Sequence, residues 1–127
     1  MPAKKQIKRS RYNQKELKEF KVLIEEKLDR AKEQMQYYLT SLAESADNAD
    51  SKIKALDDGV STVENERLIT MASRQKKLIQ HLENARLRIQ NQTYGICRET
   101  GNLISKERLR AVPHATLSIK AKQGRKG

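Results

Sequence analysis

Apolar residues recur at a seven-residue spacing through two long stretches of the chain. In the first stretch the two rows are Leu17, Ile24, Ala31, Tyr38 and Leu28, Met35, Leu42. In the second stretch the two rows are Met71, Leu78, Ala85 and Leu68, Leu82, Ile89, the last with Gln75 as an interruption. Charged residues fill most positions between the rows. This repeat is typical of coiled-coil helices.

A single break separates the two stretches. Gly59 is the only Gly or Pro in residues 3–93, and the Asp, Asn and Ser residues before it favour turns. The pattern predicts a first helix from about Gln14 to about Ala46. Ser61 and Glu64 match a capping box, which predicts the start of the second helix.

Two helices joined by a short polar loop are expected to lie antiparallel as a hairpin within one chain. The same heptads would also suit separate helices that dimerise. The similar lengths of the two stretches, on either side of the only break, favour the hairpin.

The pattern changes after Gln92, where Gly95, Gly101 and Pro113 interrupt the chain. This segment contains seven aliphatic residues expected to form a core: Ile96, Leu103, Ile104, Leu109, Val112, Leu117 and Ile119. Ser105 is placed to cap a short helix over the residues that follow it. A small compact head at the base of the hairpin is therefore predicted.

The predicted fold class is mainly α, a long antiparallel coiled-coil hairpin with a small C-terminal head. The expected divisions are a basic tail (1–13), the hairpin (14–92, tip at about 46–61), the head (93–122) and a second basic tail (123–127).

Charge is distributed unevenly along the 127 residues, whose net charge is +11. Residues 44–66 carry seven acidic residues and two lysines, a net of −5, which leaves +16 for the rest. The hairpin would place the acidic segment at its tip and the basic segments at its other end. A strongly basic balance predicts a polyanionic partner or neighbour.

Composition excludes several classes of protein. One cysteine, Cys97, cannot form a disulfide within the chain, and its rarity favours a reducing compartment. No apolar run is long enough to span a membrane, and the basic start lacks the apolar stretch of a secretory signal. We predict a cytoplasmic protein. We also predict that it is not an enzyme, because no nucleophile–base pair or phosphate-binding loop is recognisable.

The head carries a resemblance to a known family. TYGICRETGNLISKERLRAVPHATLSIKAK, residues 93–122, resembles the C-terminal zinc finger of the DksA/TraR regulators, and the preceding helix resembles their second coiled-coil helix. The four ligand positions of that finger are occupied by Cys97, Thr100, Ser118 and Ala121. Structural zinc needs four Cys or His ligands, so these residues weigh against zinc, and we predict a head that folds without a cofactor. Cys97 is then expected to be a small buried residue.

The resemblance implies a function in transcription. Members of this family insert the coiled coil into the secondary channel of bacterial RNA polymerase, where an acidic tip approaches the active site and changes the stability of promoter complexes. Their tip motif is an Asp, one residue, then Ala. Asp57 and Gly59 stand at these two positions. The alternative is that these residues have only a structural role, in a solvated turn before a helix, where acidic residues are favoured in any case.

Some relatives bind guanosine tetraphosphate as part of the stringent response. Arg74, Arg108 and Lys122 match basic positions of that site, whereas His81 replaces a Lys and Val112 replaces an Arg. Losing two cations weakens contacts to phosphate. The resemblance therefore leaves this nucleotide open as a ligand, and a generic basic surface is the alternative for the three residues.

Two other functions are possible without the family resemblance. The basic chain could bind RNA or DNA phosphates non-specifically, or it could be a structural coiled-coil scaffold. Phe20 and four tyrosines are its only aromatic residues, which is a poor stacking platform for bases. Direct sequence-specific contact with DNA is not expected.

Overall fold

A computed structural model of the chain describes residues 11–47 and 60–126. Four helices lie in these ranges: α2 (Gln14–Asp47), α4 (Val60–Gln90), α5 (Lys106–Ala111) and α6 (Ile119–Lys126). The described residues form no strand, and the only extended pairing among them is an isolated antiparallel bridge between Ile96 and Leu103. None of the described helices is long and apolar enough to span a membrane.

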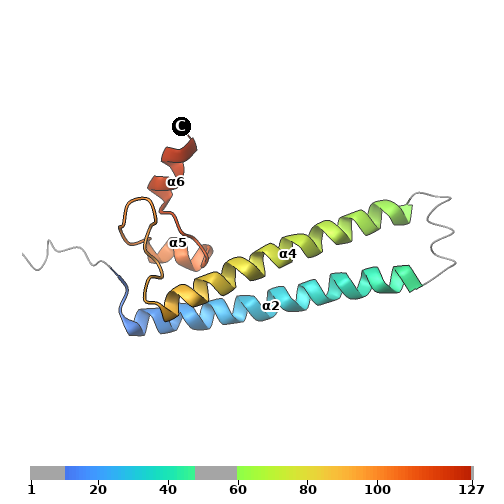
Figure 1. Cartoon of the computed structure of the whole chain (residues 1–127), viewed down its shortest axis with the longest axis horizontal. Coiled ribbons are helices and arrows are strands. Elements are labelled where there is room, and N and C mark those ends of the chain that lie inside the picture. Colours follow the sequence, from blue (N-terminus) through green and yellow to red (C-terminus); the bar gives the residue numbers. More distant parts are fainter. Residues whose placement is uncertain (1–10, 48–59, 127) are drawn as a thin grey trace, which may run out of the picture. The chain divides into compact units, whose positions relative to one another are not determined.

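The chain divides into two compact units. One contains residues 28–80, and the other contains the start of α2, the end of α4 and the head (residues up to 27 and from 81 onwards). Within each unit, the segments of α2 and α4 run side by side in opposite directions (Figure 1). The predicted fold class, mainly α with two long paired helices and a small C-terminal head, is confirmed.

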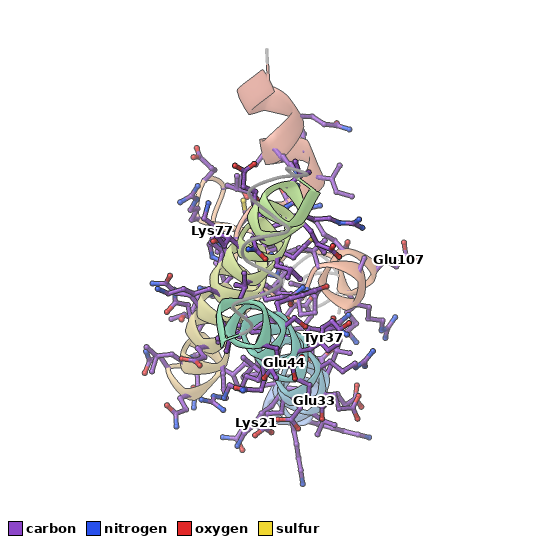
Figure 2. All side chains as sticks on the ribbon, turned by 90° about the vertical axis from the view of Figure 1, so that its right-hand side faces the viewer. Lys21, Glu33, Tyr37, Glu44, Lys77 and Glu107 are labelled. Carbon is purple, nitrogen blue, oxygen red and sulfur yellow. The ribbon has the colours of Figure 1, made fainter. Side chains whose placement is uncertain are left out.

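The predicted heptad rows face the pairing side of each helix. Their most buried members are Leu17, Ile24, Leu28, Ala31, Leu82, Ala85 and Ile89. The other row residues are half-buried, as is the interrupting Gln75. Charged side chains such as those of Lys21, Glu33 and Lys77 stand on exposed positions of the helices (Figure 2). Burial of the apolar rows contributes about 25 cal/mol per Å² of apolar surface. It therefore favours paired helices over separate helices whose apolar rows face water.

Helix α2 begins with a reciprocal capping box. The side chain of Asn13 accepts a hydrogen bond from the Glu16 backbone N–H at 2.8 Å, and Glu16 Oε1 accepts one from the Asn13 N–H at 3.1 Å. These bonds satisfy two donors that the first turn of a helix leaves free.

Helix α5 has the predicted N-cap. Ser105 Oγ accepts a hydrogen bond from the Arg108 N–H at 3.2 Å, in the extended conformation expected of a cap.

The core of the head differs from the predicted set of seven aliphatic residues. Ile104 and Leu109 are fully buried, but Ile119 is 51% exposed and the other four are half-buried. The remaining core positions belong to Tyr12, Phe20, Tyr94, Cys97 and Ala115. The expectation was wrong because it sought the core within residues 93–122, whereas two of the aromatic rings come from the beginning of the chain.

Candidate functional site

The head is built around a tight turn that presents Cys97. The Cys97 N–H donates to the carbonyl of Asn102 at 2.8 Å, and the Gly101 N–H donates to the carbonyl of Cys97, also at 2.8 Å. The positive φ of Gly101, 74°, closes this turn in a conformation that glycine adopts readily. The sequence therefore folds locally into a knuckle, with the sulfur directed into the head.

Cys97 is 1% exposed, so its predicted burial is confirmed. Burial by itself raises the pKa of a thiol. Here the Thr100 side chain and the backbone N–H groups of Ser118, Thr100 and Glu99 hydrogen-bond to the sulfur, and together they lower the Cys97 pKa to about 6. The Ser118 N–H lies 3.4 Å from Sγ. The site therefore favours a thiolate, which a description of Cys97 as a small apolar residue does not capture.

The structure brings three of the four finger positions together. Thr100 and Ser118 both contact the sulfur of Cys97 through the hydrogen bonds described above. Ser118 Oγ also accepts a hydrogen bond from the Ala121 N–H at 3.1 Å, as an N-cap of α6 would. Ala121 contributes only a half-buried methyl group.

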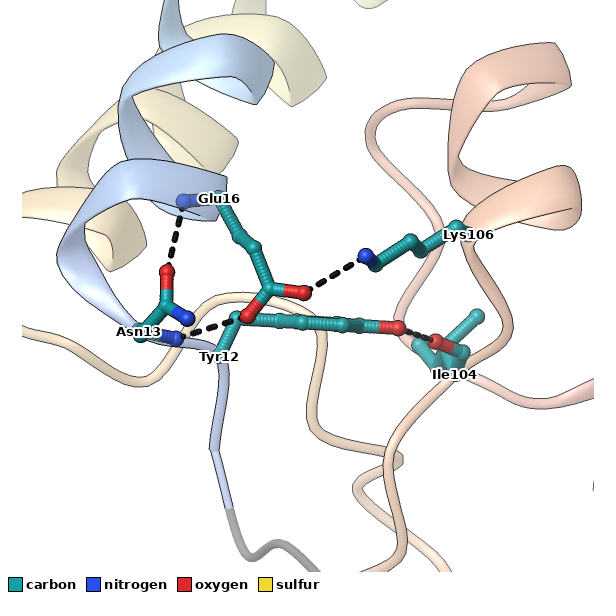
Figure 3. A network of polar contacts seen from close by, with 5 residues as sticks. All are labelled: Tyr12, Asn13, Glu16, Ile104 and Lys106. Carbon is teal, nitrogen blue, oxygen red and sulfur yellow. Dashed lines mark hydrogen bonds and ion pairs between the residues drawn. The ribbon is translucent and has the colours of Figure 1, made fainter.

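The start of the chain fastens the head to the helix pair (Figure 3). The buried Tyr12 hydroxyl donates to the carbonyl of Ile104, and Lys106 Nζ lies 2.6 Å from Glu16 Oε2. The Tyr12 ring packs against Phe20 at a centroid distance of 5.7 Å, and Phe20 packs against Tyr94 at 5.4 Å. Offset or tilted aromatic pairs of this kind stabilise a core beyond the area they bury.

These fastening residues were not identified from the sequence. Asn13 and Glu16 form the N-x-x-E variant of a capping box, which marks the helix start and was a usable signal. Tyr12 gave no signal, because its partner Ile104 lies 92 residues away along the chain.

The predicted basic residues are divided between the two units, and their grouping into one site stays a prediction. Arg74 is exposed on α4 in the unit of residues 28–80, whereas Arg108 and Lys122 belong to the other unit. Arg108 is half-buried, and its Nε donates to the carbonyl of Leu117 at 2.8 Å. Lys122 is exposed on α6. Part of the Arg108 guanidinium is thus committed to holding the head together.

The predicted tip residues, Asp57 and Gly59, lie outside the described residues. Their roles therefore stay predictions.

Three comparisons with known proteins bear on this site. Residues 92–126 match the family described as the prokaryotic dksA/traR C4-type zinc finger. A stretch of 50 residues, 39% of this chain, is 44% identical to proteins of two Caulobacter vibrioides strains called RNA polymerase-binding transcription factor DksA. That stretch spans 35% of the length of each relative. The relatives are thus described as transcription factors and not as enzymes.

A solved structure has the same fold. It is titled as that of transcription factor DksA2 from Pseudomonas aeruginosa and matches with a TM-score of 0.78 at 24% identity, covering 87% of this chain and 82% of that one. The predicted resemblance to DksA/TraR proteins is confirmed.

The prediction that weighed against zinc is contradicted by the family match, because a C4-type zinc finger points to zinc binding. The prediction considered only the four ligand positions, whereas the match extends over the whole segment 92–126. Those positions hold one thiol, two hydroxyls and a methyl group. Within residues 11–47 and 60–126, no group of three or more His, Cys, Asp or Glu is placed to hold a metal ion. The side chains present thus do not fit a four-thiolate site.

Proposed function

We propose that the chain is a member of the DksA/TraR family and a transcriptional regulator that binds bacterial RNA polymerase. The observation that carries this proposal is its 44% identity over 50 residues to relatives described as RNA polymerase-binding transcription factors. Such a regulator would act in the cytoplasm and would not be an enzyme.

The finer proposal concerns how the chain acts on polymerase. The paired helices enter the secondary channel, and the acidic tip around Asp57 and Gly59 approaches the active site and alters promoter-complex stability. The distribution of charge supports this division of roles: residues 44–66 have a net charge of −5, and the remainder has +16. Oppositely charged segments can orient a protein during association.

A pull-down with the purified chain tests the general role. We expect polymerase subunits to be recovered in a complex that survives nuclease treatment. Recovery of nucleic acid alone would instead favour the alternative function, non-specific binding to RNA or DNA phosphates.

Asp57→Asn tests whether Asp57 is the residue of the tip that alters promoter-complex stability. This change removes one charge and keeps the size and turn propensity of the side chain. The variant should still compete for polymerase, because docking uses a much larger surface than one side chain. It should lose most of its effect on open-complex lifetime at a sensitive promoter. Asp58→Asn is the matched control and should keep that effect. Equal transcription effects from wild type and Asp57→Asn would show that the assignment to Asp57 is mistaken.

Lys122→Gln tests the contribution of the basic head, including any binding of guanosine tetraphosphate. Lys122 is exposed, so the change should leave thermal stability within about 0.5 kcal/mol of wild type. We expect weaker binding to polymerase at low ionic strength and a smaller difference at high salt, because salt screens exposed charges. Arg108 is less suitable for this test, since its guanidinium also bonds to Leu117. Unchanged binding at every salt concentration would exclude this role for Lys122.

A further inference from the structure

The two histidines of the chain stack on each other within the unit that contains the head. The ring centroids of His81 and His114 are 5.4 Å apart, and the ring planes differ by 12°. His81 is exposed near the end of α4, whereas His114 is half-buried in the loop that follows α5. Neither ring has a role in the function proposed above.

Basic groups on three helices act electrostatically on His114. These groups are Lys27 of α2, His81 and Arg88 of α4, and Arg108 of α5. Arg88 Nη2 also donates to the backbone carbonyl of His114 at 3.4 Å. Nδ1 of His114 is buried and has no hydrogen-bond partner among the described residues.

This arrangement suits a neutral ring and disfavours a charged one. A neutral imidazole can carry its proton on Nε2 and leave Nδ1 as a bare nitrogen. Protonation of Nδ1 would create a buried N–H donor without an acceptor. It would also add a positive charge near Lys27, Arg88 and Arg108.

The loop that carries His114 fastens much of the head. Pro113 accepts a hydrogen bond from the Tyr94 hydroxyl at 2.8 Å, and Thr116 accepts one from the Arg98 N–H at 2.9 Å. The same loop ends at Ser118, whose N–H contacts Cys97. A displacement of residues 113–115 would therefore disturb the packing of Tyr94 and the surroundings of the thiol.

We propose that the stacked His81–His114 pair is an acid-sensitive clasp, which holds residues 113–118 on α4 while the His114 ring is neutral and releases them when His114 is protonated. Burial lowers the pKa of His114, and His81, Arg88, Arg108 and Lys27 lower it further. A histidine whose folded pKa lies below its unfolded value makes its full contribution to stability above the unfolded pKa. That contribution is lost as the pH falls below the ordinary histidine range.

Cys97 must be separated from this effect, because its pKa of about 6 gives a loss of stability in the same direction. The folded state favours the thiolate, so this contribution is also lost as the pH falls towards 6. The test therefore compares Cys97→Ser with the double variant Cys97→Ser/His114→Phe. Phenylalanine keeps an aromatic ring against His81 and cannot take up a proton.

Thermal melts between about pH 8 and about pH 5.5 provide the first measurement. Cys97→Ser should lose about 4 °C or more of Tm on acidification, and the double variant should lose clearly less. Hydrogen exchange should locate the change: at acid pH, residues 113–118 should exchange faster in Cys97→Ser than in the double variant, and at about pH 8 the two should agree. Comparing two proteins at one pH cancels the intrinsic pH dependence of exchange. Equal losses of Tm in the two proteins would overturn the proposal.

Nuclear magnetic resonance of the wild-type imidazole protons provides a second measurement that needs no variant. With two histidines in the chain, each ring can be followed separately. We expect His114 to take up its proton below the ordinary histidine pKa, together with shifts in the amides of residues 113–118. A His114 pKa at or above the ordinary value, or protonation without any change in these amides, would contradict the clasp.

Discussion

Leu82→Asp should abolish stable folding of the unit that contains the head. Leu82 is 0% exposed in the α2–α4 seam. Truncating a buried leucine costs about 2–5 kcal/mol, and a buried carboxylate without a partner adds a further penalty of several kcal/mol. Small domains have only about 5–15 kcal/mol in total. Circular dichroism should show a large fall in Tm or loss of helix at room temperature.

The matched control for this variant is Leu87→Asp. Leu87 lies on the same helix but is 53% exposed, so its replacement should change stability by about 0.5 kcal/mol or less. The pair separates the effect of burial from the effect of placing an aspartate in α4. Similar melting curves for the two variants would show that the seam is assigned to the wrong face.

Gly95→Ala should be the most damaging of the conservative changes in the head. Gly95 has φ of 78°, and a Cβ added there would lie 2.6 Å from Cε2 of Tyr12 and 3.3 Å from Cδ1 of Leu109. The Tyr12 ring cannot move away easily, because its hydroxyl is hydrogen-bonded to the Ile104 carbonyl and the ring packs against Phe20. The left-handed backbone costs about 1–2 kcal/mol for alanine, and overpacking adds about 1–3 kcal/mol.

Gly101→Ala isolates the steric part of that cost. Gly101 has φ of 74°, but nothing lies within 4 Å of the place where its Cβ would be. The backbone penalty is thus common to the two variants, and only Gly95→Ala meets the Tyr12 ring. Denaturant unfolding should show a larger loss for Gly95→Ala, by about 1–3 kcal/mol. The double variant Gly95→Ala/Tyr12→Ala should lose less free energy of unfolding than the sum of the losses in the two single variants. Equal losses would mean that Tyr12 does not pack against this turn.

The candidate site could be predicted only in part. The spacing around Cys97 led to the family whose model matches residues 92–126, because the turn of Gly95, Cys97 and Gly101 is local and is encoded by nearby residues. The inference about zinc is contradicted by the match of residues 92–126 to a family of C4-type zinc fingers. The grouping of Arg74 with Arg108 and Lys122 stays a prediction, since Arg74 lies in a different unit from the other two residues.

The sequence by itself determined the paired helices, their apolar faces and the cap of α5. A heptad repeat and a serine cap act over a few residues, so the local chain already contains the physical cause. Only the tertiary structure decided the core of the head and the neighbours of its titratable groups. Tyr12 meets Ile104 across 92 positions of sequence, and His81 meets His114 although the end of α4 and all of α5 lie between them in the chain. No periodicity connects such residues, because the burial of aromatic rings and the exclusion of water from Cys97 and from Nδ1 of His114 arise only once distant segments have packed together.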